Sequence, residues 1–288
     1  QESEIQATRE RFPRDWTDIC GHTEIIRRLR HLCLLRRVPH ALLFTGIDGI
    51  GKKRTARVFA RTLLCAAGGD APCGVCESCR MMAAGAHPDF FETTPQARGK
   101  SVPMIRTEQV REILVEASRH PTAAQRRILL IDAAECMNET AANRLLKTLE
   151  EPAKHILFIL LTSAYDALLP TIRSRIVRIA FGALHSAEIA AMLRTRFGVQ
   201  EADVIAALSG GSLAAALSLA ERGLLQRDDA LAFLAALPTM RMEEIWMYAE
   251  KIGALSVAER MEWIGFFQMG LRDLLVLLES GAAKELFH

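Results

Sequence analysis

The glycine-rich segment at residues 46–53 is the first place where residue types and spacing predict chemistry. It reads Gly-Ile-Asp-Gly-Ile-Gly-Lys-Lys, and Gly46, Gly49 and Gly51 would let backbone N–H groups turn inward around phosphate oxygens. A compact apolar run precedes the segment and a helical pattern follows it, so a helix N-terminus would add positive potential. Lys52 would reach the terminal phosphates of a nucleotide. This strand-to-helix context favours a phosphate loop over a glycine-rich turn without a ligand.

Parts of a working nucleotide site are missing from the same sequence. Lys53 stands where Ser or Thr should supply a Mg²⁺-binding hydroxyl, and a cation cannot coordinate a cation. Asp132 ends an apolar run, as a Mg²⁺-binding carboxylate would, but the next residue is Ala133 instead of a Glu that activates water. Glu135 lies too far along to replace it. We therefore expect weak ATP binding or none, and no hydrolysis.

Four cysteines form a second pattern with chemical meaning. Cys65, Cys73, Cys76 and Cys79 are spaced C-x7-C-x2-C-x2-C in a loop at 65–79 that contains Gly and Pro. Two interlocked C-x-x-C turns can place thiolates around one ion, and four sulfurs without an open position indicate a structural Zn²⁺ site. Four free thiols, a redox C-x-x-C or another soft ion are the alternatives. The other three cysteines are interpreted as small core side chains: Cys20, Cys33 and Cys136.

The elements that must position these residues alternate between strands and helices. Apolar runs predict strands at 41–45, 89–94, 127–132, 156–162 and 176–180, and helical spacing lies between them at 54–64, 107–118 and 138–150. This alternation predicts an α/β fold with a covered parallel sheet. After residue 181 the pattern is helical, at 185–197, 202–208, 213–221 and 227–287, with breaks near Pro238 and Gly253. We expect an α/β domain at 1–181, a small helical domain at 182–223 and a helical tail at 224–288.

The overall charge and hydropathy exclude some classes of function. Lys plus Arg number 36 and Asp plus Glu 34, so the net charge of +2 gives no nucleic-acid footprint. The arginine clusters at 27–30 and 36–37 are interpreted as solvated helix faces. No apolar run approaches the roughly 20 residues that span a bilayer, and the start has no signal-peptide core. The sequence predicts a soluble, cytoplasmic protein.

Several further segments carry a resemblance to a known family. They are 39–44 (Pro-His-Ala-Leu-Leu-Phe), 87–90 (His-Pro-Asp-Phe), 143–152 (Asn-Arg-Leu-Leu-Lys-Thr-Leu-Glu-Glu-Pro) and 169–175 (Leu-Pro-Thr-Ile-Arg-Ser-Arg). Together with the degenerate phosphate loop and its four-cysteine insert, they resemble the δ′ subunits of bacterial DNA polymerase III clamp loaders, within the AAA+ superfamily. The likeness spans roughly residues 21–217. It implies a P-loop domain with a zinc knuckle, a helical lid and a helical collar, here with a short collar.

The resemblance implies roles for single residues. The family has a Ser-Arg-Cys motif whose Arg reaches the γ-phosphate of ATP on a neighbouring subunit, and this chain retains Arg175 but has Ile176 in place of the Cys. The alternative is that Arg173 and Arg175 cap a helix. Thr162 or Ser163 would match the polar sensor 1 residue. At the position of the family's sensor 2 arginine, this chain has Ala214. The resemblance therefore implies that residues contacting a nucleotide in the chain's own site are lost, while the arginine that reaches the neighbouring subunit is kept.

The resemblance also implies an assembly. The chain would be a non-hydrolysing subunit beside γ or τ motor subunits and a clamp-opening δ subunit, and would act on the sliding clamp indirectly. Contact with primed DNA would be shared among the subunits. One alternative is a catalytically active γ/τ-type ATPase, which Lys53, Ala133 and Ala214 argue against together. Another is a zinc-dependent nucleic-acid-binding module, which the near-neutral charge disfavours.

Overall fold

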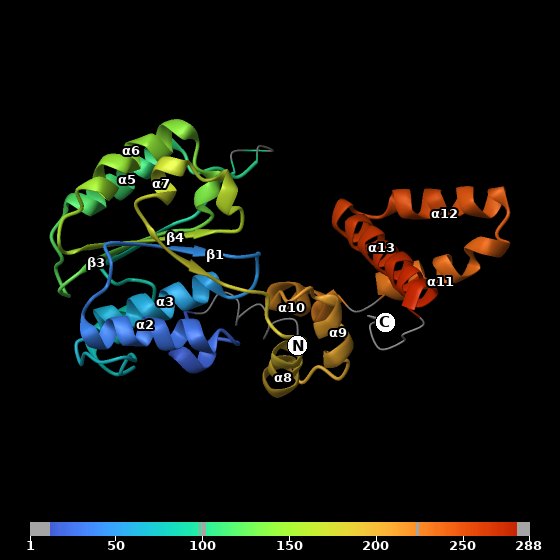
Figure 1. Ribbon diagram of the computed structural model, residues 1–288, viewed down its shortest axis with the longest axis horizontal. Coiled ribbons are helices and arrows are strands. Elements are labelled where there is room, and N and C mark those ends of the chain that lie inside the picture. Colours follow the sequence, from blue (N-terminus) through green and yellow to red (C-terminus); the bar gives the residue numbers. More distant parts are fainter. Residues whose placement is uncertain (1–11, 98, 100–101, 223–224, 281–288) are drawn as a thin grey trace.

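The computed structural model describes residues 12–97, 99, 102–222 and 225–280. Five strands form one parallel sheet in the order β2-β3-β4-β1-β5, which confirms the predicted α/β class (Figure 1). All residues of β1, β3 and β4 are buried, which explains why these strands are apolar on both faces. The strands are β1 (Ala41–Thr45), β2 (Phe90–Thr93), β3 (Arg127–Ile131), β4 (Ile156–Thr162) and β5 (Val177–Ala180).

Helices cover both faces of the sheet, as Figure 1 shows. Alternate side chains of β1 enter different cores: Leu42 and Phe44 pack with α3, whereas Ala41 and Leu43 pack with α5 and α6. One face carries α2 (Thr23–Leu35), α3 (Lys52–Leu64) and α4 (Glu77–Ala83). The other carries α5 (Thr107–Ser118), α6 (Glu139–Glu150) and α7 (Pro170–Arg173). Three short 3-10 turns join these elements: η1 (Trp16–Asp18), η2 (Ala134–Cys136) and η3 (Tyr165–Ala167).

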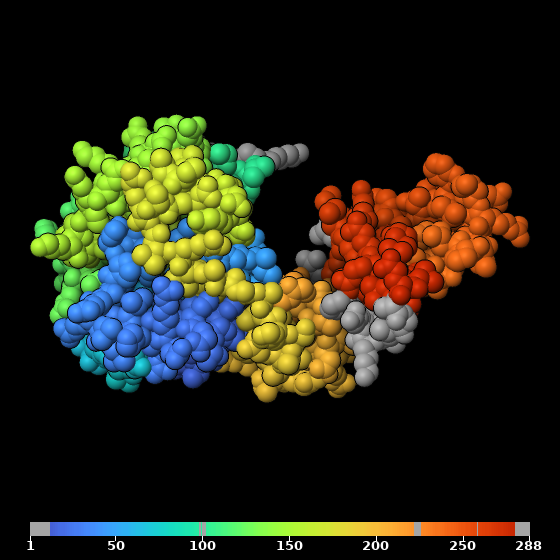
Figure 2. Space-filling view, viewed as in Figure 1, coloured from blue at the N-terminus to red at the C-terminus, as the bar shows by residue number. Residues whose placement is uncertain are grey.

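The chain after β5 is helical and extends away from the sheet. In Figures 1 and 2, α8–α10 lie between the sheet and the C-terminal helices. A third hydrophobic core joins both helical groups, since Ile189 and Ala216 belong to the same cluster as Phe233 and Trp263. The helices are α8 (Ser186–Phe197), α9 (Ala202–Leu208), α10 (Leu213–Arg222), α11 (Leu225–Ala236), α12 (Met242–Ala254) and α13 (Val257–Ser280), with η4 (Leu237–Thr239) after α11.

The predicted helix break near Gly253 is present and falls two residues later. α12 continues through Gly253, and the break falls at Leu255 and Ser256. Ser256 sets the new start because its backbone N–H donates to Glu259 and its hydroxyl accepts from the Glu259 N–H, a reciprocal cap. The predicted helical residues 281–287 lie outside the described residues. None of the described helices is long and apolar enough to cross a membrane.

Candidate functional site

The glycine-rich loop is wrapped around its own lysine. Gly46, Gly49 and Gly51 have φ angles of 148°, 78° and 99°, which glycine adopts more readily than other residues. Lys52 begins α3, two residues earlier than predicted, and its Nζ donates to the carbonyls of Gly46 (2.5 Å) and Ile47 (2.8 Å). Burial lowers the pKa of Lys52. The sequence-predicted loop is therefore formed, with its lysine held by main-chain oxygens.

Lys53 occupies the space between two carboxylates. Its Nζ lies 2.8 Å from Glu92 Oε1 and 3.1 Å from Asp132 Oδ2. Glu92 also accepts two hydrogen bonds from Arg57, at 2.9 and 2.8 Å. Burial works to raise the pKa of Glu92, but Arg57 and Lys53 outweigh it and the pKa is lowered. The predicted metal-binding Asp132 is thus already paired with a side-chain cation.

Glu92 is a residue of the site that the sequence reasoning missed. It lies on β2, next to β3 in the sheet, so it faces the end of β3 where Asp132 follows. The available signal was a single charged residue within a short, otherwise uncharged strand, Phe-Phe-Glu-Thr. A half-buried carboxylate in such a strand is stabilised by a cationic partner. Here two partners, Lys53 and Arg57, come from the same helix α3.

The other polar residues near the loop are engaged elsewhere. Thr55 Oγ1 donates to the Gly51 carbonyl (3.0 Å) within α3 and does not replace the missing hydroxyl. Glu135 lies in η2, past the end of β3, and accepts from the N–H and the hydroxyl of Ser163 (2.9 and 2.7 Å). Burial opposes ionisation of Glu135, yet the Ser163 donors lower its pKa. Buried Thr162 accepts from the Ala164 N–H at 3.1 Å.

Residues of α8 and α10 cover a cavity of about 340 Å³ beside the loop. We call these two helices, together with Ser212 before α10, the roof of the cavity. Its lining includes the predicted Gly49, Gly51, Lys52, Lys53 and Asp132, and also Ala214. Among the described residues, Gly46, Thr162 and Arg175 do not line it. The structure therefore brings five of the predicted nucleotide-site residues around one cavity, and two lie outside its lining.

Direct hydrogen bonds fix the roof to the loop. Ser212 Oγ donates to the Asp48 carbonyl (2.9 Å), and the Ala214 N–H donates to the Gly49 carbonyl (3.1 Å). A Cβ at Gly49 would lie 2.3 Å from Ser212 Oγ and 2.6 Å from Ala214 Cβ, so the approach requires glycine. Arg196 of α8 and Asp18 also line the cavity, and they form an ion pair at 3.0 Å.

The four cysteines converge as the spacing predicted. Their Sγ atoms all lie within 4.8 Å of one another, and Cys65 Sγ is 3.9 Å from Cys76 Sγ. Zinc–sulfur bonds of about 2.3 Å in a tetrahedron separate the sulfurs by about 3.8 Å, so the arrangement fits such an ion. Cys65 directly follows α3, Cys76 caps the N-terminus of α4 and Cys79 lies within α4, so the two helices position three of the ligands. The cluster can hold a metal ion.

Backbone donors surround these sulfurs. The N–H groups of Cys73, Cys76 and Cys79 point at the sulfurs of Cys65, Cys73 and Cys76, at 3.3 to 3.4 Å. Several hydrogen-bond donors lower the pKa of exposed Cys73 to about 6, and the Cys76 N–H has the largest effect. Burial, in contrast, raises the pKa of Cys79 to about 12. Outside the cluster, Cys20 and Cys33 are buried as predicted, while Cys136 is half-buried.

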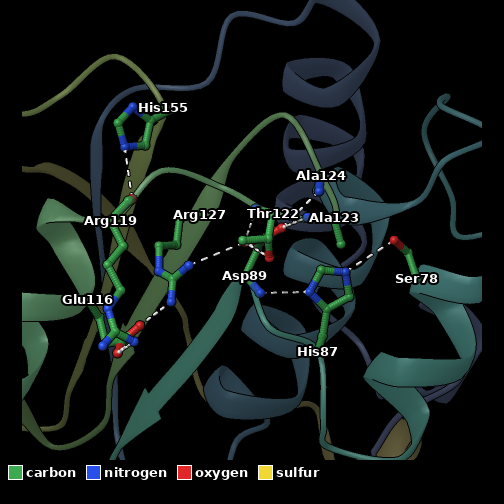
Figure 3. Close-up of polar contacts among 10 residues, drawn as sticks. All are labelled: Ser78, His87, Asp89, Glu116, Arg119, Thr122, Ala123, Ala124, Arg127 and His155. Carbon is green, nitrogen blue, oxygen red and sulfur yellow. Dashed lines mark hydrogen bonds and ion pairs between the residues drawn. The ribbon is translucent and has the colours of Figure 1, made fainter.

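A buried polar chain connects this cysteine loop to the sheet (Figure 3). His87 Nδ1 accepts from the Asp89 N–H (3.0 Å), so the ring proton lies on Nε2, which donates to Ser78 Oγ in α4 at 3.1 Å. Burial lowers the pKa of His87 against the opposing charge of Asp89, and the neutral ring is favoured. The His-Pro-Asp-Phe segment thus anchors α4.

The carboxylate of Asp89 is fully buried and organises the loop before β3 (Figure 3). It accepts from the backbone N–H groups of Thr122 (2.8 Å), Ala123 (2.7 Å) and Ala124 (2.8 Å). Arg127 lies 3.3 Å away and also pairs with Glu116. Burial works to raise the pKa of Asp89, but the three N–H donors outweigh it and the pKa is lowered.

Arg175 follows α7 on the far side of the sheet from the cysteine loop. Its Nη2 lies 2.6 Å from Glu150 Oε1, and its Nη1 donates to the Thr171 carbonyl at 2.7 Å. This second contact caps α7, as the alternative interpretation required. Arg173 differs, because it pairs with Asp166 at 3.0 Å and stacks over the Tyr165 ring. The two arginines therefore have separate partners.

Comparisons with known proteins agree with the motifs. A family model described as "DNA polymerase III, delta subunit" matches residues 21–185, more than half of the 288. The DNA polymerase III subunit delta′ of Pseudomonas aeruginosa is 40% identical over 179 residues, which cover 60% of this chain and 53% of that protein. The tau subunit of Escherichia coli is 32% identical over 224 residues, 75% of this chain and 34% of that protein.

The chain thus spans about half, or less, of the length of these curated relatives. Among solved structures, a RuvB mutant of Thermotoga maritima matches with a TM-score of 0.51 and 15% identity, over 93% of this chain and 79% of that one. This likeness shows the AAA+ fold alone. On the family match, the chain belongs to the DNA polymerase III delta subunit family, and within it resembles the δ′ subunits.

Proposed function

We propose that the chain is a non-hydrolysing δ′-type subunit of a DNA polymerase III clamp loader, which completes the ATP site of a neighbouring motor subunit through Arg175. In this proposal the first 181 residues form the P-loop domain, residues 182–223 the lid, and residues 224–288 a collar that meets γ or τ and δ subunits. The assembly would place the sliding clamp on primed DNA in the cytoplasm. Zinc in the cysteine cluster would be structural.

The observation that carries the proposal is the position of the Lys53 ammonium. It lies 3.1 Å from Asp132 and 2.8 Å from Glu92, so the carboxylate that would hold Mg²⁺ is neutralised by a fixed side chain. A divalent ion would have to displace this ammonium and would then be repelled by it. Without Mg²⁺ bridging the phosphates and without a base at Ala133, phosphoryl transfer loses its two main supports.

Arg175 supports the second half of the proposal. A guanidinium is planar and permanently charged, which suits it to stabilise charge on a transferring phosphoryl group. The side chain is about one-third exposed, 35%, so a partner can reach it. Arg175 does not line the cavity in its own chain, as expected of a residue that acts on another subunit. An arginine finger is worth about 10³- to 10⁵-fold in the rate at the site that it serves.

The active γ/τ-type ATPase remains the alternative function, because a tau subunit covers more of this chain than the delta′ protein does. Ala214 argues against it, since that position in the roof has no charged group to offer a γ-phosphate. The two functions differ in which polypeptide turns over ATP.

Steady-state ATP turnover tests the proposal. The reaction contains the motor subunits, their δ partner and primed DNA, with this chain added as wild type, Arg175→Ala or Arg173→Ala. Arg173→Ala is the matched control, because it removes an adjacent guanidinium that has other partners. We expect stimulation by the wild type and by Arg173→Ala, loss of the adjacent site's turnover with Arg175→Ala, and none from the chain alone. Turnover by the chain alone would assign it to the γ/τ type.

A further inference from the structure

Glu150 lies in the segment 143–152, but the sequence assigned it no chemical role. Its carboxylate forms an ion pair with the guanidinium of Arg175. It is the last residue of α6, and its Oε1 lies 2.6 Å from Arg175 Nη2. A carboxylate at a helix C-terminus faces the negative end of the helix dipole, which is unfavourable unless a cation compensates it. Arg175 supplies that cation, although it comes from a segment that is 25 residues later in the sequence. The ion pair thus links the C-terminal ends of α6 and α7 through the guanidinium group.

The contacts leave part of the guanidinium available. An arginine has five N–H donors. Nη1 donates to the Thr171 carbonyl at 2.7 Å and to Ser174 Oγ at 3.1 Å, and Nη2 faces Glu150. The Nε–H and the second hydrogen on Nη2 have no partner within the described part of the chain. Two donors remain for a phosphate oxygen while the others fix the plane of the group.

We infer that Glu150 is a positioning residue for Arg175, an inference that rests on the proposed function. Glu150 and the Thr171 carbonyl hold the guanidinium in one orientation before the neighbouring ATP site forms. A pre-oriented group needs no reorganisation when charge develops on the phosphoryl oxygens, and this raises the rate of the chemical step. Glu150 does not touch ATP, so its effect is on kcat and passes through Arg175.

The test is a double-mutant cycle in the complete clamp loader with primed DNA. Turnover is measured as kcat and as KM for ATP with this chain as wild type, Glu150→Gln, Arg175→Ala and the double variant. Gln keeps the length and a hydrogen-bond acceptor but removes the charge. Glu151→Gln is the matched control: that side chain is exposed, one residue further on, and has no partner among the described residues. Thermal unfolding of each variant monitors the fold.

We expect Glu150→Gln to lower kcat about two- to fivefold, the range of a partly exposed ion pair, with KM unchanged. Glu151→Gln should leave both unchanged, and Glu150→Gln should add nothing in the Arg175→Ala background. An unchanged kcat, a raised kcat, or a loss that persists without Arg175 would each overturn the inference while leaving the proposed function intact. If Arg175→Ala itself has no effect, the proposed function fails first.

Discussion

The Asp89 carboxylate gives the sharpest test of how the α/β part is held together. Replacing it with Ala leaves the N–H groups of Thr122, Ala123 and Ala124 without their acceptor, and Arg127 with Glu116 as its remaining carboxylate. Removing one partner of a buried charge pair costs about 3–5 kcal/mol. Because Asp89 is fully buried, solvent does not compensate. We expect Asp89→Ala to lose about 4 kcal/mol, a large share of a total near 5–15 kcal/mol.

Asp89→Asn refines the same prediction. Oδ1 accepts from the Thr122 N–H and Oδ2 from the Ala123 and Ala124 N–H groups, so an Asn NH₂ faces a backbone donor whichever way it turns. The cost should be about 2 kcal/mol, the loss of hydrogen bonds to a charged acceptor. Asp203→Asn is the control, since its carboxylate is exposed and pairs with Arg194 at the surface.

Urea unfolding followed by circular dichroism measures these free energies. Hydrogen exchange of residues 119–127 locates the effect, because the amides of the loop before β3 should exchange faster in both Asp89 variants and at the wild-type rate in Asp203→Asn. A loss below about 1 kcal/mol in Asp89→Ala, which is the scale of an exposed ion pair, would refute the reasoning. Exchange that rises elsewhere but not in this loop would refute it as well.

Three other perturbations have defined outcomes. Cys79→Ser should abolish stoichiometric zinc, measured by metal analysis, and lower the thermal midpoint; equal zinc content would contradict a four-sulfur site. The pKa of His87 is lowered by burial from its ordinary 6.5, so the unfolding free energy should decrease as pH falls below about 6.5 towards the folded pKa. His87→Gln should flatten that decrease in urea titrations, and an unchanged slope would assign it to another group. Lys53→Ser should gain Mg²⁺-dependent ATP binding in calorimetry without turnover, because Ala133 still offers no base; Mg²⁺-dependent binding by the wild type would contradict the ion-pair argument.

The strands and several helices could be predicted because their signals are local. β1 and β4 have the predicted bounds, since each is a continuous apolar run that ends at a turn. α5 and α9 also agree at both ends. The start of α3 was missed because the loop conformation, with Gly51 at positive φ, lets Lys52 join the helix. Local pattern thus located the elements, most boundaries differ by at most one residue, and backbone geometry moved the start of α3 by two.

The candidate site was only partly predictable because its partners come from distant segments. Residue 53 alone shows that the Mg²⁺-binding hydroxyl is absent. Its ion-pair partner Glu92, however, lies 39 residues later on an edge strand, so this pairing could not be predicted locally. Glu150 likewise meets Arg175 only because α6 and α7 pack on the same face. Cysteine spacing was sufficient by itself, since all four ligands lie in one short stretch. Pairings across the fold need the sheet order, which sequence spacing does not specify.

The close approach of the roof to Gly49 has a consequence for how this loop evolves. Any side chain at that position would collide with Ser212 and Ala214, whether or not a nucleotide ever binds. Selection for a well-packed junction would therefore preserve the glycine even without selection for catalysis. A motif search would continue to recognise the loop as nucleotide-binding. The glycine at this position therefore reflects a mechanical fit between two parts of the chain, and residues 53 and 133 are the positions that bear on catalysis.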